Sequence, residues 1–296
     1  MLDIYSGIVI MIFVSILFFW FTVIVSSKFP RRVADVFAVF ALLGMILYIR
    51  YLWDKAEISW FVPYSNAIIL GNWFPVITAI LSALVYHRIP GEKFRKYGMV
   101  TLLNLVGIYA LFQPIVGITP ECKNQIDEFG IARQSSQVSC SPTSAVNLLA
   151  YYGIKTTESE MSALCLTKTK RSWLGFQLDD GGTSWMGLYR GLKLKLSGSK
   201  FEPRFFSLTF EEFTEDPRGP VIVSLMLDPS LEKKNPRQYE RLRFLGWRPG
   251  LEHNVVFVEM SDWSVSIVDP EVGYEEMTPD EFEALWVGRG IFLETH

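Results

Sequence analysis

Long uninterrupted apolar runs fill the first 118 residues of the chain, and shorter apolar segments alternate with polar ones after them. The run between Asp3 and Lys28 carries no charged residue. At about 1.5 Å per residue, a helix of this length crosses about 30 Å of hydrocarbon. Three similar runs follow, so the pattern predicts four transmembrane helices, at residues 5–26, 36–53, 66–86 and 98–118. Pro114 is expected to kink the fourth helix.

The start of the chain lacks the features of a cleaved secretory signal. A signal peptide begins with basic residues and has a shorter apolar core. Here Asp3 precedes the apolar run, and no small-residue cleavage site is evident after it. We therefore expect the first helix to be retained, as part of an α-helical transmembrane domain of four spans.

Composition and charge indicate two parts in different solvents. Half of the 296 residues are hydrophobic and the mean hydropathy is +0.23, which is high for one water-soluble domain. Residues 1–118 hold nine Lys and Arg against five Asp and Glu, a net charge of +4, whereas residues 119–296 have a net charge of −7. The acidic second part argues against nucleic-acid binding. We predict a transmembrane domain at 1–118 and a second domain at 119–296.

The basic residues predict the orientation in the membrane. They gather in the loops after the first and third predicted helices, at Lys28, Arg31, Arg32, Arg88, Lys93, Arg95 and Lys96. The positive-inside rule places these loops in the cytoplasm, so residues after 118 lie outside. We expect a multi-pass protein of the inner (cytoplasmic) membrane whose second domain faces the periplasm or cell exterior. No charged residue lies in the middle of a span, so we interpret the helices as an anchor in the lipid bilayer, which could also pair with a membrane partner.

A cysteine lies at the start of a predicted helix in the second domain. Apolar residues recur there with the spacing of one helix face, at Ala145, Leu148, Leu149 and Tyr152. Pro142 suits the first turn and Gly153 the C-terminal cap. Cys140 would then lie at the helix N-terminus, where the dipole favours the thiolate. A lone cysteine is more often a small buried apolar residue, so its neighbours must decide between the two interpretations.

The other two parts of a catalytic triad have candidates further along the chain. Of the three histidines, only His253 lies away from both the membrane part and the C-terminus. An antiparallel hairpin centred on Ser261 would place it directly opposite Asp269, on the same face. Cys140, His253 and Asp269 would then be nucleophile, base and orienting carboxylate. The alternative is a surface His–Asp pair. For the oxyanion, the backbone N–H of Cys140 is one donor, and Gln134 and Gln137 both qualify as the second.

From about residue 131 onward, the chain resembles papain-like cysteine peptidases of the double-glycine, bacteriocin-processing family. Members carry a glutamine six residues before the cysteine and a helix that ends in Tyr-Tyr-Gly, as at Gln134, Cys140 and residues 151–153. Further family motifs follow in the same order: Gly-Thr-Ser at 182–184, Gly-Pro-Val-Ile at 219–222, a strand led by His253, Asp-Pro at 269–270, and the ending at 281–288.

The resemblance implies an α+β papain-like domain with an antiparallel sheet, in which Cys140 is the nucleophile. It makes His253 the base, Asp269 the orienting residue and Gln134, rather than Gln137, the oxyanion donor. The implied activity is cleavage of an exported or membrane-proximal protein or peptide, with no cofactor and no metal. Trp185, Trp247 and Trp286 could line a peptide groove, although packing in the core is the more ordinary role.

Two departures from the family pattern keep other functions open. Family members usually have glycine after the cysteine, whereas this chain has Ser141. A catalytically silent binding or sensor domain is therefore one alternative, and a papain-like acyltransferase is another. The chain also has no GxxxxGK[ST] motif, so the resemblance does not imply an ABC transporter.

The two remaining cysteines, Cys122 and Cys165, would face an oxidising compartment if the second domain is outside. We therefore expect them either to form a disulfide or to remain as two ordinary core cysteines.

Overall fold

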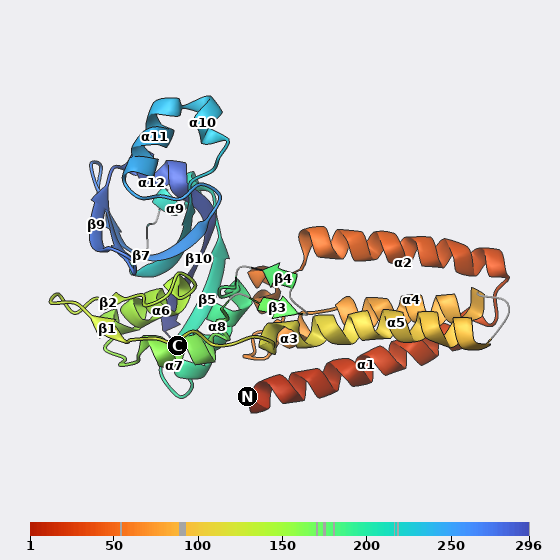
Figure 1. Ribbon diagram of the computed structural model, residues 1–296. Helices are drawn as coiled ribbons and strands as arrows, with labels where there is room; N and C mark the ends of the chain where they lie inside the picture. The colour runs from red at the N-terminus through yellow and green to blue at the C-terminus, as the bar shows by residue number, and fades with distance from the viewer. Residues whose placement is uncertain are drawn as a thin grey trace. The chain divides into compact units, whose positions relative to one another are not determined.

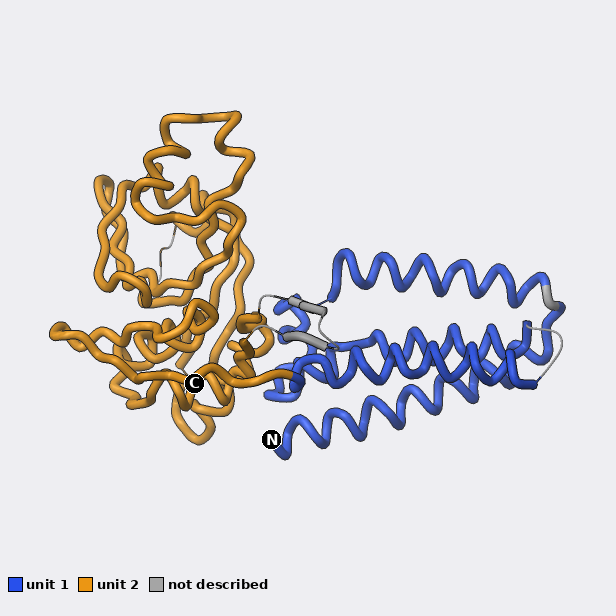
Figure 2. The backbone as a smooth tube through the Cα atoms, in the orientation of Figure 1, with its two compact units in different colours: residues 1–116 blue, residues 117–296 orange. Residues whose placement is uncertain are grey.

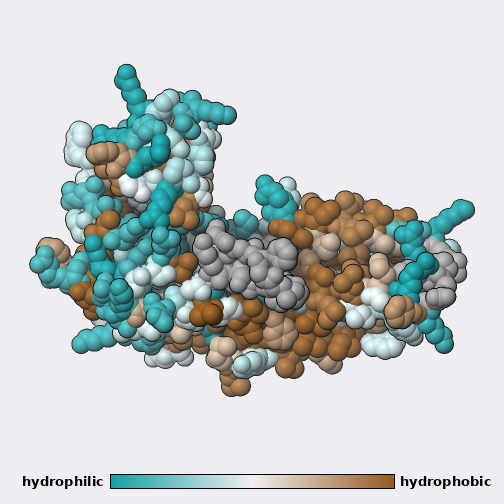
Figure 3. Space-filling view, in the orientation of Figure 1, coloured by the Kyte–Doolittle hydropathy of each residue, from teal (hydrophilic) through white to brown (hydrophobic). Residues whose placement is uncertain are grey.

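The computed structural model describes the chain except for residues 54, 89–92, 170, 174–175, 180, 216, 218 and 296, and it describes Arg31, 171–173 and 176–179 by their backbone only. The chain divides into two compact units, residues 1–116 and 117–296 (Figure 2). The division falls two residues before the boundary predicted from the sequence. The surface of the first unit is mostly hydrophobic and that of the second mostly hydrophilic on the face drawn in Figure 3.

Within its described residues, the first unit contains four helices that are long and apolar enough to cross a membrane, as the sequence predicts. Figure 1 labels them α1, α2, α3 with α4, and α5. Their bounds are Leu2–Ser26 for α1, Arg31–Tyr51 for α2, Ala67–Leu70 for α3, Phe74–Arg88 for α4 and Lys93–Phe112 for α5. A short 3-10 helix, Ala56–Trp60, lies in the connection between α2 and α3. Helix α4 packs against α1, α2 and α5 and is the most buried of the four spans.

Two of the predicted spans differ in detail from the structure. The third is interrupted between Leu70 and Phe74, where the Asn72 side chain accepts a hydrogen bond from the Phe74 N–H (3.3 Å) and donates one to the Ala110 carbonyl (2.8 Å). The fourth begins at Lys93, and Pro114 does not kink it. Helix α5 ends at Phe112 instead, and Pro114 lies in a 3-10 turn, because proline cannot donate the next helical hydrogen bond.

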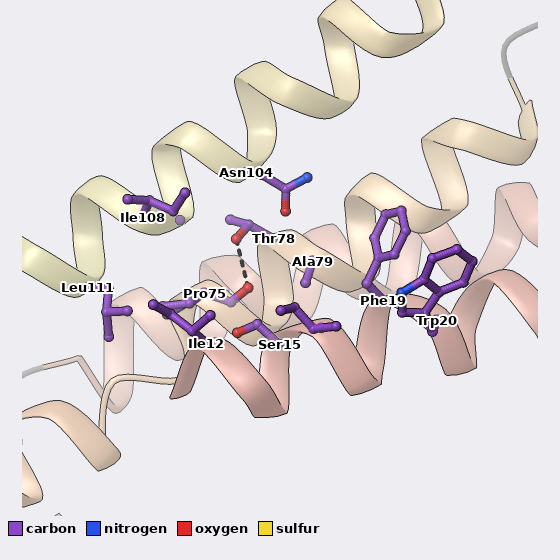
Figure 4. Close-up of a pocket in the computed structure, with 12 residues that line it drawn as sticks. Ile12, Ser15, Phe19, Trp20, Pro75, Thr78, Ala79, Asn104, Ile108 and Leu111 are labelled. Atoms are coloured by element: carbon purple, nitrogen blue, oxygen red, sulfur yellow. Dashed lines mark hydrogen bonds between the residues drawn. The ribbon is translucent and has the colours of Figure 1, made fainter. Parts of the chain in front are cut away.

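An apolar cavity of about 380 Å³ lies between α1, α4 and α5 (Figure 4). Its few polar side chains bond to carbonyls of their own helices. Ser15 donates to Met11 (2.8 Å), Thr78 to Pro75 (2.9 Å) and the Asn104 amide to Val100 (2.8 Å). These bonds remove much of the cost of holding polar groups in hydrocarbon, in keeping with a unit that lipid surrounds.

Among its described residues, the second unit is built on an antiparallel sheet of six strands in the order β5-β10-β6-β7-β8-β9 (Figure 1). The strands are β5 (Phe201–Ser207), β6 (Val221–Met226), β7 (Glu252–Met260), β8 (Val265–Asp269), β9 (Gly273–Met277) and β10 (Trp286–Thr295). Two small two-stranded sheets accompany it: β1 (Gln125–Ile126) with β2 (Ala132–Arg133), and β3 (Arg171–Trp173) with β4 (Phe176–Asp179).

Helices cover the sheet and complete an α+β fold, as the sequence predicts. Helix α6 (Cys140–Tyr151) packs against β6, β7 and β8, and α7 (Glu158–Leu164) and α8 (Trp185–Lys195) pack beside it. The second unit has a core of buried apolar residues, which includes Leu225, Val255, Phe257 and Phe282. The remaining helices are α9 (Phe210–Glu215), α10 (Leu231–Lys234), α11 (Pro236–Phe244) and α12 (Pro279–Leu285). The sheet thus holds β7 and β8 against the start of α6, where the candidate residues lie.

Candidate active site

Cys140 is the first residue of α6, with Ser139 as the N-cap. The helix forms where the apolar spacing predicts it, and Ala145, Leu148 and Leu149 are fully buried on its inner face. This packing fixes the axis of the helix, so the half-buried Cys140 sulfur stays at the N-terminus, where the dipole and free N–H groups favour negative charge.

His253 and Asp269 come from adjacent strands of the sheet. His253 is the second residue of β7 and Asp269 is the last of β8. The His253 Nε2 lies 3.0 Å from one carboxylate oxygen of Asp269 and 2.9 Å from the other. Both side chains are largely shielded from solvent, with 15% and 7% exposed. A carboxylate in this position fixes the orientation of the imidazole ring and keeps the proton on Nε2.

The hairpin register predicted from the sequence is wrong by two residues. The observed pairs Val256–Val268 and Phe257–Ile267 place Asp269 level with Val255 rather than with His253. The turn causes the difference, because the Met260–Val265 pair centres the hairpin between residues 262 and 263 rather than on Ser261. A bulge between Phe257 and Glu259 then shifts the pairing back by one residue. Residues 253 and 255 point to the same face because side chains alternate along a strand, so His253 still reaches Asp269 as a diagonal neighbour.

The Cys140 thiol and the His253 ring form a coupled pair. Burial of Cys140 opposes ionisation, but the hydrogen bond and charge of His253 outweigh it, so the pKa of the thiol is lowered. Burial alone would lower the pKa of His253. The hydrogen bonds and charges of Asp269 and Cys140 outweigh this effect and raise the pKa of His253 to about 10. Because Nε2 is held by Asp269, the ring nitrogen facing the sulfur is Nδ1. Together these shifts favour a thiolate beside an imidazolium at neutral pH.

Of the two glutamines that the sequence offers as oxyanion donors, Gln134 is bonded to the segment that carries Asp269. Its backbone N–H donates to the carbonyl of Pro270 (2.7 Å), the residue after Asp269, and its side chain is half-buried. The Gln134 Oε1 is buried without a hydrogen-bond partner. Gln137, by contrast, is exposed. Gln134 is thus attached to the strand end that carries Asp269.

Trp247, one of the three tryptophans that the sequence offered as the lining of a peptide groove, contacts the candidate site. It follows α11, and its ring packs edge-on against the His253 ring, with centroids 6.0 Å apart. A cavity of about 100 Å³ beside them is lined by Leu245, Gly246, Trp247, Arg248, Leu251, His253, Asp269, Glu271, Val272 and Glu275. Burial and the neighbouring Asp269 carboxylate raise the pKa of Glu275 to about 7. The other two tryptophans pack elsewhere: Trp185 donates to Glu252 (2.9 Å), and Trp286 stacks near Phe213.

Ser141, where the resembled family usually has glycine, is accommodated without crowding. Its side chain is buried, with 3% exposed, and its Oγ accepts a hydrogen bond of 2.7 Å from the Asn254 side-chain amide. Asn254 directly follows His253 on β7. The substitution thus adds a link between the cysteine helix and the histidine strand.

The disulfide hypothesis for Cys122 and Cys165 is wrong for this structure, in which all three cysteines are described and free. The Cys122 sulfur lies 3.4 Å from the Ser162 hydroxyl, whereas the Cys165 sulfur packs against Gly191 in the interior. Burial raises the pKa of Cys122 and raises that of Cys165 to about 12. Cys140 is therefore the cysteine whose environment favours the reactive thiolate.

In the part of the chain that the structure describes, no group of three or more His, Cys, Asp or Glu side chains could hold a metal ion.

Several peptidase domains of known structure are similar to this chain. The peptidase domain of Streptococcus ComA, a bifunctional ABC transporter involved in quorum sensing, is 20% identical over 56% of this chain and 97% of that one, with a TM-score of 0.41. A double glycine motif protease from an AMS/PCAT transporter, solved with a leader peptide, is 14% identical over 61% and 99%, with a TM-score of 0.39. The Streptococcus mutans ComA peptidase domain is 20% identical over 55% and 98%, with a TM-score of 0.32.

No family model matches the chain, and no curated protein matches it in sequence. One of the similar structures is a double glycine motif protease, which is the kind of enzyme that the sequence motifs resemble.

Proposed function

We propose that residues 117–296 form a membrane-anchored cysteine peptidase that cleaves an exported or membrane-proximal protein or peptide. The observation that carries this proposal is the hydrogen bonding of His253 Nε2 to Asp269, together with the lowering of the pKa of Cys140 by His253. This arrangement supplies a nucleophile, a proton carrier and a group that orients the carrier.

The reaction would begin with attack of the Cys140 thiolate on the carbonyl carbon of the scissile peptide bond. The carbonyl oxygen gains the electron pair and becomes an oxyanion, which the Cys140 N–H and the Gln134 side-chain amide would stabilise. His253, already protonated, gives its proton to the departing amine as the C–N bond breaks. Water, deprotonated by His253, then hydrolyses the Cys140 thioester and restores the thiolate.

The electrostatics of the site support a working peptidase over a silent domain. A structural cysteine buried without a partner has a raised pKa, as Cys165 has. The lowered pKa of Cys140 is the opposite result, and it stems from its pairing with His253 in spite of burial. Activated thiolates of this kind are typical of nucleophilic cysteines.

We test the function by comparing the termini of exported peptides and proteins in cells with the wild-type chain and with Cys140→Ala. A defined set of new termini should disappear in Cys140→Ala, because the variant has no atom that can form the thioester. Cys122→Ala, which alters a cysteine outside the site, should keep the full set. Identical termini in all three strains would contradict the peptidase function.

The proposed orientation places the peptidase on the opposite side of the membrane from the basic loops. Single cysteines introduced at two exposed positions, Trp263 (85% exposed) and Phe94 (88% exposed), test it in a chain whose own cysteines are replaced by alanine. A membrane-impermeant maleimide should label Trp263→Cys in intact cells and Phe94→Cys only after lysis. The reverse pattern would place the peptidase in the cytoplasm.

A further inference from the structure

Three side chains tie the cysteine helix to the histidine strand. The Asn254 side-chain amide donates to Ser141 Oγ (2.7 Å), and the Asn254 carbonyl accepts from Ser144 Oγ (2.7 Å). The backbone of Asn254 also helps to lower the pKa of the Cys140 thiol. We call Ser141, Ser144 and Asn254 the serine clamp. All three residues are buried, with 3%, 0% and 7% exposed.

The clamp acts on the position of His253 because Asn254 is its neighbour on β7. Ser141 and Ser144 are three residues apart, so their hydroxyls lie on the same side of α6. They hold the backbone and the side chain of Asn254 from two points. With Asn254 fixed on α6, the His253 ring has little freedom to move along the strand relative to Cys140.

The clamp also acts on the charge of the sulfur, through the hydroxyl proton of Ser141. A serine hydroxyl has one proton to donate and two lone pairs that accept. The Asn254 amide occupies a lone pair, which leaves the proton free to point elsewhere. The Cys140 sulfur lies 4.0 Å from Ser141 Oγ, at the outer limit of a hydrogen bond to sulfur. A donor at this position stabilises the thiolate and not the neutral thiol.

We propose that Ser141 and Asn254 are positioning residues of the nucleophile, which orient a hydroxyl donor towards the Cys140 thiolate and hold His253 beside it. This inference rests on the proposed function, since it concerns the same sulfur. It gives Ser141 a role in this chain that a glycine at the same place could not perform, because glycine has neither donor nor acceptor in its side chain.

The test follows the pH dependence of Cys140 alkylation by iodoacetamide in the purified full chain in detergent, read by mass spectrometry of the Cys140 peptide. Ser141→Ala removes the donor, and we expect the midpoint of the rate profile to move upward by about one pH unit. Asn254→Asp keeps the shape of the side chain but presents only acceptors to Ser141. The hydroxyl would then turn from the sulfur, and the midpoint should again rise. Ser141→Thr keeps a hydroxyl and should stay closer to the wild-type midpoint.

The control is Ser266→Ala, which removes the hydroxyl of a buried serine on β8. Ser266 Oγ accepts from the Tyr274 hydroxyl (2.9 Å), and this variant should leave the midpoint unchanged. Alkylation of the buried Cys165 in each sample reports unfolding, because it should stay slow in every folded variant. If folded Ser141→Ala and Asn254→Asp both keep the wild-type midpoint, the proposed role of the serine clamp is wrong, whereas the proposed peptidase activity is unaffected. A wild-type Cys140 without a lowered midpoint would instead count against the peptidase itself.

Discussion

Replacing His253 with alanine should reduce peptide cleavage by about 10³-fold or more, and it should end the fast alkylation of Cys140 near neutral pH. Two effects combine. The leaving amine loses its proton donor, and the thiol loses the hydrogen bond and the positive charge that lower its pKa. Burial is then opposed only by Ser141 and Asn254, so the pKa of Cys140 should rise. Turnover of a cleaved peptide and the rate of alkylation at pH 7 measure the two effects separately.

The matched control is His87→Ala, which removes a histidine from α4 in the first unit, where it bonds to the Val23 carbonyl (3.0 Å). This variant should keep both fast alkylation and cleavage. Slow alkylation of wild-type Cys140 that His253→Ala does not change would favour a silent binding domain. Fast alkylation without cleavage of any peptide would favour an acyltransferase, which forms the same thioester but transfers the acyl group to an amine.

Replacing Asp269 with asparagine should lower turnover by about 10²- to 10⁴-fold and narrow the pH range of activity from the alkaline side. The carboxylate is the main group that raises the pKa of His253 against the effect of burial. The proton that His253 gives to the leaving amine is present only below that pKa. Wild-type activity should therefore fall as the pH rises through about 10, and the fall in Asp269→Asn should come at lower pH.

The pH profile of turnover between pH 5 and 11 measures this shift. Asp262→Asn changes an exposed aspartate in the turn between β7 and β8 and should leave the profile as it is. An unchanged alkaline limb in Asp269→Asn would mean that Asp269 does not support the charge of His253. The acid limb reports the thiol and should lie below the ordinary cysteine pKa in both proteins, because His253 remains beside the sulfur.

The parts of the molecule that depend on composition and local pattern could be predicted from the sequence. Four apolar runs give four helices because a span needs only length and hydropathy. The amphipathic spacing after Cys140 predicts α6 because the period of the apolar residues depends only on residues close together in the sequence. The ends of the helices were less accurate, since particular contacts such as those of Asn72 determine where a helix stops.

The candidate site was predictable in its residue types and less so in its geometry. The chain has three histidines and three cysteines, so few candidates exist, and the helix pattern and the family motifs predict Cys140 and His253 among them. The register was wrong because the turn is centred between residues 262 and 263 rather than on Ser261, and the alternation of the two strands does not mark that difference. The link between Ser141 and Asn254 joins positions 113 residues apart, and no local pattern reveals such a contact. Trp247 was considered as a groove residue, but its contact with His253 could not be predicted from the sequence, because it too depends on the three-dimensional fold.

The position of β10 in the sheet determines when, during synthesis, the sheet can be completed. Residues 286–295 lie between β5 and β6, although they follow every other strand in the chain. During synthesis, Cys140, His253 and Asp269 are therefore all made before the strand that joins the two sides of the sheet. A nascent chain that has been synthesised as far as Asp269 still lacks this strand. The sheet that holds the three candidate residues can therefore be completed only at the end of synthesis.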